Sequence, residues 1–332
     1  MSQWRLFESW CRKRDVDPLK ATSVLVCEFL MYLFNDRKLQ AKSIAGYKSA
    51  LSFFLKRASG YDLSTCTVVA DLLRSFYRER PPPPRVVVKW DIPTVLRFLQ
   101  SAAFNPDVIT PRLLTLKAIF LFALASGRRR SELHALERES VSFASDMSAV
   151  TVRPHLRFLS KTHLATQGIG ALHEIIVPAL PDAPDTPYSL CPVRVLKHYI
   201  DTSDTYRSPG QNRLFVSYRK SFERDITAQT VSRYVKTAIC EAHSAAEVDS
   251  DTDVASKYDV KAHQVRHIAH SLSQLGSMPL TDIIRTGSWK TPNTFIKHYI
   301  QQLPSASVSE LQQLGSFVAM ESVFQHKEPV GF

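Results

Sequence analysis

The sequence predicts a mainly α-helical protein of two domains, with a small antiparallel β-sheet in the second domain. Three observations lead to this prediction. Apolar residues recur three and four positions apart through most of the 332 residues, which is the spacing of a buried helix face. A run of four prolines at 81–84 interrupts this pattern and cannot be helical. Stretches rich in β-branched or alternating apolar residues occur only after the prolines, at 149–153, 156–160 and 173–180.

The first domain, residues 1–80, is expected to be entirely helical. Trp4, Phe7 and Trp10 share one face of the first helix because they recur every third position. No stretch here alternates apolar and polar residues with the period of two that a half-buried strand requires. Ser23 is expected to cap the second helix. The third helix should begin near Ser43, and the fourth should run from about Thr67 to Arg80.

Residues 81–89 are expected to form a semi-rigid linker, because consecutive prolines favour the extended polyproline II conformation. The second domain should span 90–305, and residues 306–332 should form a helical C-terminal tail. Expected helices begin at Asp91 with Pro93 and at Thr110 with Pro111, the latter ending at Gly127, and then cover about 192–202, 227–243, 261–275, 279–286, 292–302 and 307–324.

The strands of the second domain are expected to be short and antiparallel. The stretches 149–153 and 156–160 are predicted to pair through a turn at Pro154, with 173–180 as a third strand. Residues 214–217 are a further candidate for a brief strand.

The composition favours a globular, nucleic-acid-binding protein. The formal net charge is +11, which favours polyanion partners, although a basic protein without such a partner is the alternative. The five cysteines are scattered and form no C-x-x-C pair. This pattern favours reduced thiols in a cytosolic or nuclear protein over a disulfide scaffold or a zinc ribbon. No apolar stretch approaches the ~20 residues of a membrane-spanning helix, so no membrane partner is expected.

Basic residues gather on the polar faces of the first domain and beside the prolines. Such a stripe is often only a solvated helix face, but the excess of one sign favours contact with phosphates. The candidate DNA-binding residues are Lys42, Lys48, Lys56 and Arg57 in the third helix, with Arg85 and Lys89 flanking the linker; Arg74, Arg78 and Arg80 line the fourth helix.

Three segments carry residue types suited to chemistry on a phosphodiester. They are S-G-R-R-R-S-E-L at 126–133, H-Q-V-R at 263–266, and W-K-T-P-N-T-F-I-K-H-Y at 289–299. Each segment taken singly has an ordinary structural interpretation, such as a glycine-terminated helix followed by a capped one. Their joint occurrence, in this order, is what favours a shared active site.

The residue types match the demands of the reaction. His263 and Arg266 lie three positions apart and so share one helix face. An arginine presents a rigid bidentate hydrogen-bond donor to phosphate. A histidine can accept or donate a proton near neutral pH. The Tyr299 hydroxyl, with an ordinary pKa of ~10, needs cationic neighbours to act as a nucleophile at neutral pH.

Together the segments resemble the tyrosine recombinases, the phage-integrase family. Arg129 matches the arginine of S-G-x-R-x-S-E-L, while His263 and Arg266 match the H-x-x-R motif. Trp289 matches the family's His/Trp position, and Tyr299 matches the nucleophile. The resemblance covers nearly the whole chain, and its first domain is similar to the family's helical, SAM-like core-binding domain. The second domain corresponds to the family's catalytic domain.

The resemblance also implies which neighbouring residues serve the site. The family uses a β-hairpin lysine, for which Lys161 is the candidate. Arg128 and Arg130 flank the first catalytic arginine, but the spacing to the S-E-L residues favours Arg129. Glu132 is expected to brace the site. The phrases C-P-V-R at 191–194 and Thr294-Phe295 resemble the recombinases of eukaryotic DIRS-type retroelements, which implies a nuclear protein or a cytoplasmic one before integration.

The mechanism implied is DNA cleavage and rejoining through a 3′-phosphotyrosine, without metal or other cofactor. The partners implied are double-stranded DNA and, on synapsed DNA, three further copies of the chain, with a monomer or dimer when free. Two alternatives stay open: a catalytically silent DNA-binding protein domesticated from a mobile element, and a type IB topoisomerase. A zinc site at His263, His267 and His270 is disfavoured, because no acidic or cysteine ligand accompanies them.

Overall fold

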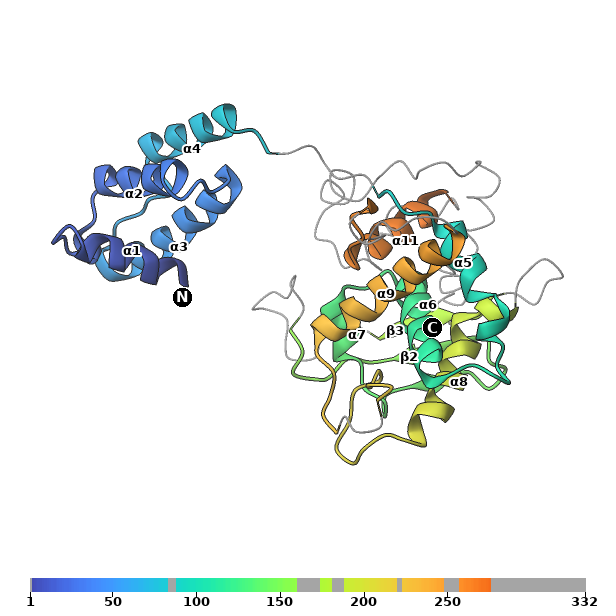
Figure 1. Cartoon of the computed structure of the whole chain (residues 1–332). Helices are drawn as coiled ribbons and strands as arrows, with labels where there is room; N and C mark the ends of the chain where they lie inside the picture. The colour runs from blue at the N-terminus through green and yellow to red at the C-terminus, as the bar shows by residue number, and fades with distance from the viewer. Residues whose placement is uncertain are drawn as a thin grey trace, which may run out of the picture. The chain divides into compact units, whose positions relative to one another are not determined.

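The computed structural model describes residues 2–82, 88–159, 174–180, 188–219, 223–247 and 257–275. The chain divides into two compact units, Met1–Val86 and Val87–Phe332 (Figure 1). Across the described residues the fold is mainly helical with one three-stranded antiparallel sheet, as the sequence predicts. No helix in these ranges is long and apolar enough to span a membrane.

The first unit packs its described helices around one apolar core. Large side chains from three helices, including Phe7, Phe29 and Ile44, are completely buried there. Burial of each such side chain stabilises the folded unit by roughly 1.5–3 kcal/mol. Aromatic edge-to-face contacts, such as that between Phe7 and Phe29, add specificity. The helices are α1 (Ser2–Arg12), α2 (Ser23–Asn35), α3 (Ala41–Ser59) and α4 (Thr67–Glu79).

Two expected helix starts in this unit need correction. Thr22, and not Ser23, caps α2, because the Thr22 hydroxyl accepts a hydrogen bond from the Leu25 N–H at 3.3 Å. The third helix begins at Ala41, two residues before Ser43, since Ala41 is already part of the buried face.

Arg80 has a structural role that its position in a basic stripe did not indicate. Its guanidinium donates hydrogen bonds to the carbonyl oxygens of Leu39 at 2.8 Å and Phe34 at 3.3 Å. It also lies over the Phe34 ring, which stacks on Phe76. The side chain thus satisfies carbonyls near the end of α2 and ties that end to α4, instead of facing a phosphate.

The second unit is organised around α6 (Pro111–Ser126), whose residues from Leu114 to Ser126 are all buried. The helices α8 (Pro192–Asp204), α9 (Ala228–Ala246) and α11 (His263–Leu275) pack against it. The expected caps are confirmed: Asp91 caps α5 (Ile92–Leu99), and Thr110 caps α6. The short helix α7 (Arg130–Ala135) follows α6 almost directly. The expected helices at 279–286, 292–302 and 307–324 lie outside the described residues.

The sheet has the order β1-β2-β3, but its partners differ from the expected ones. β2 (Ala149–Val152) pairs with β1 (Ser142–Phe143) and with β3 (Ile175–Pro178), with Val150 opposite Val177. The stretch 156–159 forms no strand. After Pro154 the chain turns instead, because the His155 N–H bonds to the Ala135 carbonyl at 2.8 Å and leaves Leu156 exposed.

The expected strand at 214–217 is also wrong. Arg213 makes a single β-bridge with Glu137, and the Leu214 N–H donates to the Leu136 carbonyl at 2.8 Å. The Val216 N–H then donates to the buried Tyr199 hydroxyl at 2.9 Å. The segment is apolar because it fills the core beside α8, and its backbone is satisfied by single contacts instead of a ladder.

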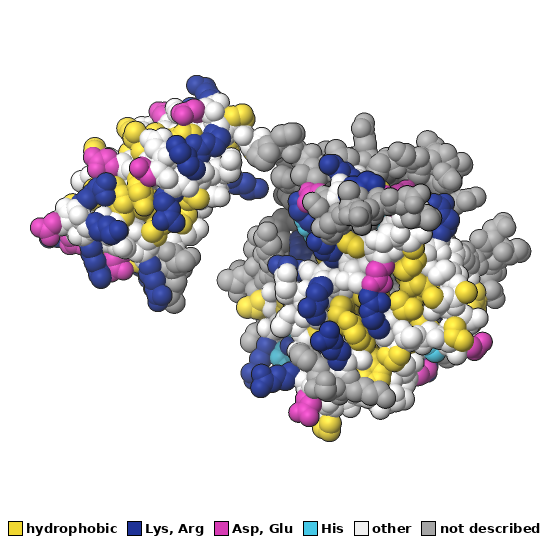
Figure 2. All heavy atoms as spheres, viewed as in Figure 1, with side chains coloured by type: hydrophobic (Ala, Val, Ile, Leu, Met, Phe, Trp, Pro, Cys, Tyr) yellow, Lys and Arg dark blue, Asp and Glu magenta, His cyan; other side chains and the backbone are white. Residues whose placement is uncertain are grey.

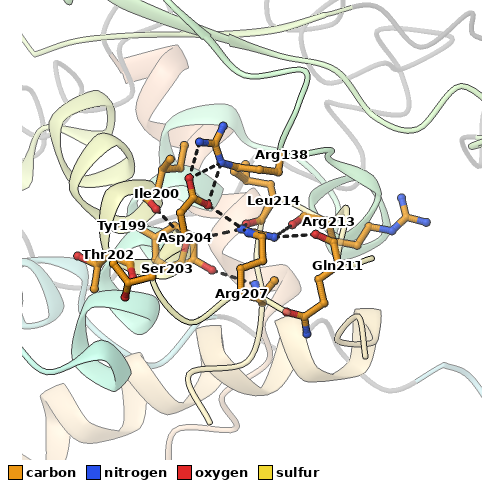
Figure 3. A network of polar contacts seen from close by, with 12 residues as sticks. Arg138, Tyr199, Ile200, Thr202, Ser203, Asp204, Arg207, Gln211, Arg213 and Leu214 are labelled. Atoms are coloured by element: carbon orange, nitrogen blue, oxygen red, sulfur yellow. Dashed lines mark hydrogen bonds and ion pairs between the residues drawn. The ribbon is translucent and has the colours of Figure 1, made fainter. Parts of the chain in front are cut away.

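A network around Arg207 holds this segment in place (Figure 3). The guanidinium donates to three carbonyl oxygens, those of Gln211, Arg213 and Leu214, at 2.6–3.1 Å. Asp204 pairs with both Arg207 and Arg138. These ion pairs and hydrogen bonds connect the end of α8 to the 211–214 segment and to the residues that follow α7.

Candidate active site

The turn between α6 and α7 places Arg129 at the edge of the second unit's core. Gly127 ends α6 in the left-handed conformation, with φ +57°, which a glycine adopts without strain. Arg129 is extended, with φ −74° and ψ 151°, and immediately precedes α7. Residues 127–129 therefore form a short turn that connects the two helices, as the S-G-R-R-R phrase indicated.

A buried carboxylate joins the two arginines that the sequence singled out. Glu132 is completely buried and accepts hydrogen bonds from the backbone N–H of Arg129 at 3.1 Å and from its Nη1 at 2.6 Å. The Oε2 atom of Glu132 also lies 3.8 Å from the Nη1 atom of Arg266. Glu132 thus braces the site, and it brings the α6–α7 turn and α11 to one point.

Arg266 is fixed from the interior. Its side chain is only 4 % exposed, and Nη1 donates to the Gly127 carbonyl oxygen at 2.7 Å. The Arg129 side chain is 18 % exposed, so it retains a solvent-facing side. The Arg266 guanidinium is therefore held by the buried Gly127 carbonyl, whereas the Arg129 guanidinium remains accessible to a ligand from solvent.

The three consecutive arginines occupy distinct environments. Arg128 is buried, and burial lowers its pKa. Arg130 is exposed and reaches α9, where its Nη1 donates to Gln229 Oε1 at 3.1 Å. Arg129 forms the ion pair with Glu132 at 2.6 Å, and its choice as the catalytic arginine stays a prediction from the S-E-L spacing.

His263 begins α11 at the surface, one turn before Arg266. Its ring lies 5.5 Å from that of His267. Desolvation by surrounding atoms and the positive charges of Lys261 and Arg130 lower the pKa of His263, while Asp259 opposes this shift. The ring is therefore neutral near pH 7 and able to accept a proton.

The exposed face of α9 is also basic, and sequence analysis did not select it. Gln229, Arg233 and Lys236 are exposed and lie four and three residues apart, so they share one helix face. In Figure 2, lysine and arginine side chains gather over the part of the second unit where α7 and α9 lie. The signal was present in the sequence as basic residues at helical spacing within the helix expected at 227–243.

The candidate DNA-binding residues of the first unit lie on α3. Lys42, Lys56 and Arg57 are exposed, whereas Lys48 is half-buried. Lys56 Nζ pairs with Asp62 at 2.7 Å, which offsets part of its charge. Near the start of the second unit, Lys89 is exposed.

Four expected site residues lie outside the described residues: Lys161, Trp289, Tyr299 and Arg85. The ends of the segment that carries Lys161 are nevertheless fixed, because Val152 pairs with Ile175 at the close of β2 and the start of β3. In the described ranges, no group of three His, Cys, Asp or Glu residues is arranged to hold a metal ion.

No protein-family model matches the sequence, and no curated protein matches it. Solved structures match over most of the chain. One is the XerH site-specific recombinase bound to a palindromic difH substrate in a post-cleavage complex, at 14% identity over 90% of this chain and 72% of that chain, with a TM-score of 0.53. Another is the Tn1549 transposon integrase in complex with transposon right end DNA, at 13% identity over 92% of this chain and 86% of that chain, with a TM-score of 0.51. The chain therefore has the fold of the tyrosine recombinases.

Replacing Glu132 by glutamine should destabilise the second unit by about 3 kcal/mol, because it removes the charge that two largely buried guanidiniums share. The matched control is Glu139→Gln, whose exposed side chain should contribute within about 0.5 kcal/mol. Hydrogen exchange of the α6 amides, followed by mass spectrometry on the whole chain, reports the difference. Equal protection in both variants would show that the carboxylate charge does not hold the turn.

Proposed function

We propose that this protein is a tyrosine recombinase that cleaves and rejoins double-stranded DNA through a 3′-phosphotyrosine at Tyr299. The observation that carries the proposal is the convergence of Arg129 and Arg266 on one buried carboxylate, with His263 one turn before Arg266 on α11, on a fold shared with DNA-bound recombinases. Two guanidiniums at one point suit a phosphate whose charge grows during in-line attack.

The proposed reaction exchanges one phosphate ester for another. The Tyr299 oxygen forms a bond to phosphorus as the bond to the 5′ oxygen breaks, while Arg129 and Arg266 bind the non-bridging oxygens. His263 accepts the tyrosine proton, and Lys161 donates a proton to the departing 5′ oxygen. Trp289 donates its indole N–H or supports the tyrosine helix. A second 5′-hydroxyl then attacks the phosphotyrosine, so the reaction consumes no nucleotide and needs no metal.

DNA is proposed as the partner on two grounds. Exposed basic residues occur on α3 in the first unit and on α7 and α9 in the second, where they can replace the counterions of the DNA backbone. The XerH and Tn1549 structures contain DNA. Exchange between two duplexes requires four copies of the chain. A DIRS-type retroelement origin and a nuclear location belong to the same proposal, and the C-P-V-R phrase at 191–194 supports them.

Nicked suicide duplexes built from repeats that flank the gene should give a covalent protein–DNA adduct, and Tyr299→Phe should give none. Arg129→Lys and Arg266→Lys keep the positive charge but lose the bidentate hydrogen-bond donor, so each should slow adduct formation by about 10²-fold or more. Arg97→Lys, at an exposed position on α5, is the control and should be unchanged.

The same experiment distinguishes the other functions. An adduct that survives Tyr299→Phe would move the nucleophile to another residue. DNA binding without any adduct would support a silent DNA-binding protein. Relaxation of supercoiled plasmid without recombinant products would support a topoisomerase.

The rate of adduct formation should fall as pH drops through the pKa of His263, because only the neutral ring accepts the tyrosine proton. Since that pKa is lowered from 6.5, the acid limb of a single-turnover profile between about pH 5 and pH 8 should lie below pH 6.5. Lys261→Met removes a charge that lowers the pKa and should move the limb to higher pH. Asp259→Asn should move it the opposite way, and shifts of the same sign in both variants would contradict the role of His263.

A further inference from the structure

His270 lies at the point where the α6–α7 turn meets α11, and no step of the proposed reaction uses it. Its side chain is completely buried one turn after Arg266. Its Nε2 atom lies 3.2 Å from the Gly127 carbonyl oxygen, the same atom that accepts a hydrogen bond from Arg266 at 2.7 Å. One carbonyl therefore receives two side chains from successive turns of α11.

The glycine and the imidazole ring constrain each other sterically. A Cβ atom at position 127 would lie 2.7 Å from Cε1 and 2.9 Å from Nε2 of His270, which is closer than atoms in contact can approach. The left-handed φ of Gly127 disfavours a side chain as well. The His270 ring thus fills the space beside Gly127, and Arg129 lies only two residues after that glycine.

His270 is neutral in this setting. Burial and the nearby charges of Arg266 and Arg128 hold its pKa well below the ordinary value, against the hydrogen bond to Gly127. One ring nitrogen therefore carries a proton, and because a carbonyl oxygen only accepts hydrogen bonds, we assign that proton to Nε2. A neutral donor satisfies the carbonyl without adding a further positive charge beside two arginines.

We propose that His270 is a positioning residue for the phosphate-binding arginines, which shares the Gly127 carbonyl with Arg266 and so fixes the turn that carries Arg129 against α11. This inference rests on the proposed function. The residue acts through the turn and touches no substrate. Its loss leaves the arginines present but allows the turn to shift, and a displacement of about 1 Å can slow a positioned reaction about 10²-fold.

The first test compares two replacements of similar length. His270→Gln can still donate from its terminal amide, whereas His270→Met cannot, and His198→Met on α8 controls for the loss of a histidine elsewhere. On nicked duplexes, His270→Met should slow single-turnover adduct formation at least about 10-fold with the DNA dissociation constant within about 2-fold. His270→Gln should recover most of the rate. Equal rates in the Gln and Met variants, whether wild-type or reduced, would overturn the proposal.

The second test does not depend on catalysis. In the whole chain, Gly127→Ala should lower the thermal midpoint of the second unit, and it should lower it less in a His270→Ala background, where the steric conflict with the ring is absent. Additive effects of the two substitutions would overturn the geometry on which the proposal rests.

The two tests separate this inference from the proposed function. Non-additive stabilities with unchanged cleavage in His270→Met would reject the positioning role and leave the recombinase assignment intact. A wild-type protein that forms no adduct on flanking repeats would reject the recombinase assignment, and the positioning role would fail with it, whatever the stability cycle showed.

Discussion

The candidate site depends on the pairing of a completely buried carboxylate, Glu132, with guanidiniums from two segments far apart in the chain. Placing a charge inside a protein costs several kcal/mol unless partners of opposite charge surround it. Arg129 supplies one such partner from the same turn, and Arg266 supplies a second where α11 lies against that turn. The contact between Glu132 and Arg266 therefore helps to fix the spacing of the arginines, and groups fixed before the substrate arrives need no reorganisation during reaction.

The rest of the second unit supports this contact from both sides. The buried helix α6 provides the apolar core on which α8, α9 and α11 pack. Near the start of the unit, the Trp90 indole N–H donates to Gln264 Oε1 at 3.0 Å, inside the H-x-x-R segment itself. After α7, the Arg207 network and the Leu214–Leu136 hydrogen bond hold the 211–214 segment against the residues that follow α7. Stability of the core and geometry of the site are therefore served by the same residues.

What the sequence predicted correctly was determined locally. The caps at Asp91 and Thr110 and the helical spacing of α6 depend on neighbours within a few residues, so their pattern can be interpreted without a fold. The strand expected at 156–160 is wrong because β2 pairs instead with β1 and with β3, where Val177 lies opposite Val150. Pairing of strands is decided by the core they cover, and no local pattern encodes it.

The same distinction applies to the site. Motif spacing selected Arg129 from three adjacent arginines, of which Arg128 is buried and Arg130 contacts α9, and the catalytic role of Arg129 stays a prediction. Sequence analysis could not assign Arg80 to helix capping or His270 to the Gly127 carbonyl, because both contacts join segments distant in sequence. Lys161, Trp289 and Tyr299 stay predictions from the motifs alone.

The most direct measurement is an experimental structure of the Tyr299→Phe variant bound to an intact target duplex. The account predicts that the guanidiniums of Arg129 and Arg266 both donate to non-bridging oxygens of one phosphate, with the ring of residue 299 from the same or a neighbouring copy directed at that phosphorus. A duplex whose phosphates all avoid this pair of arginines, or a residue 299 directed away from the phosphate in every copy, would contradict it.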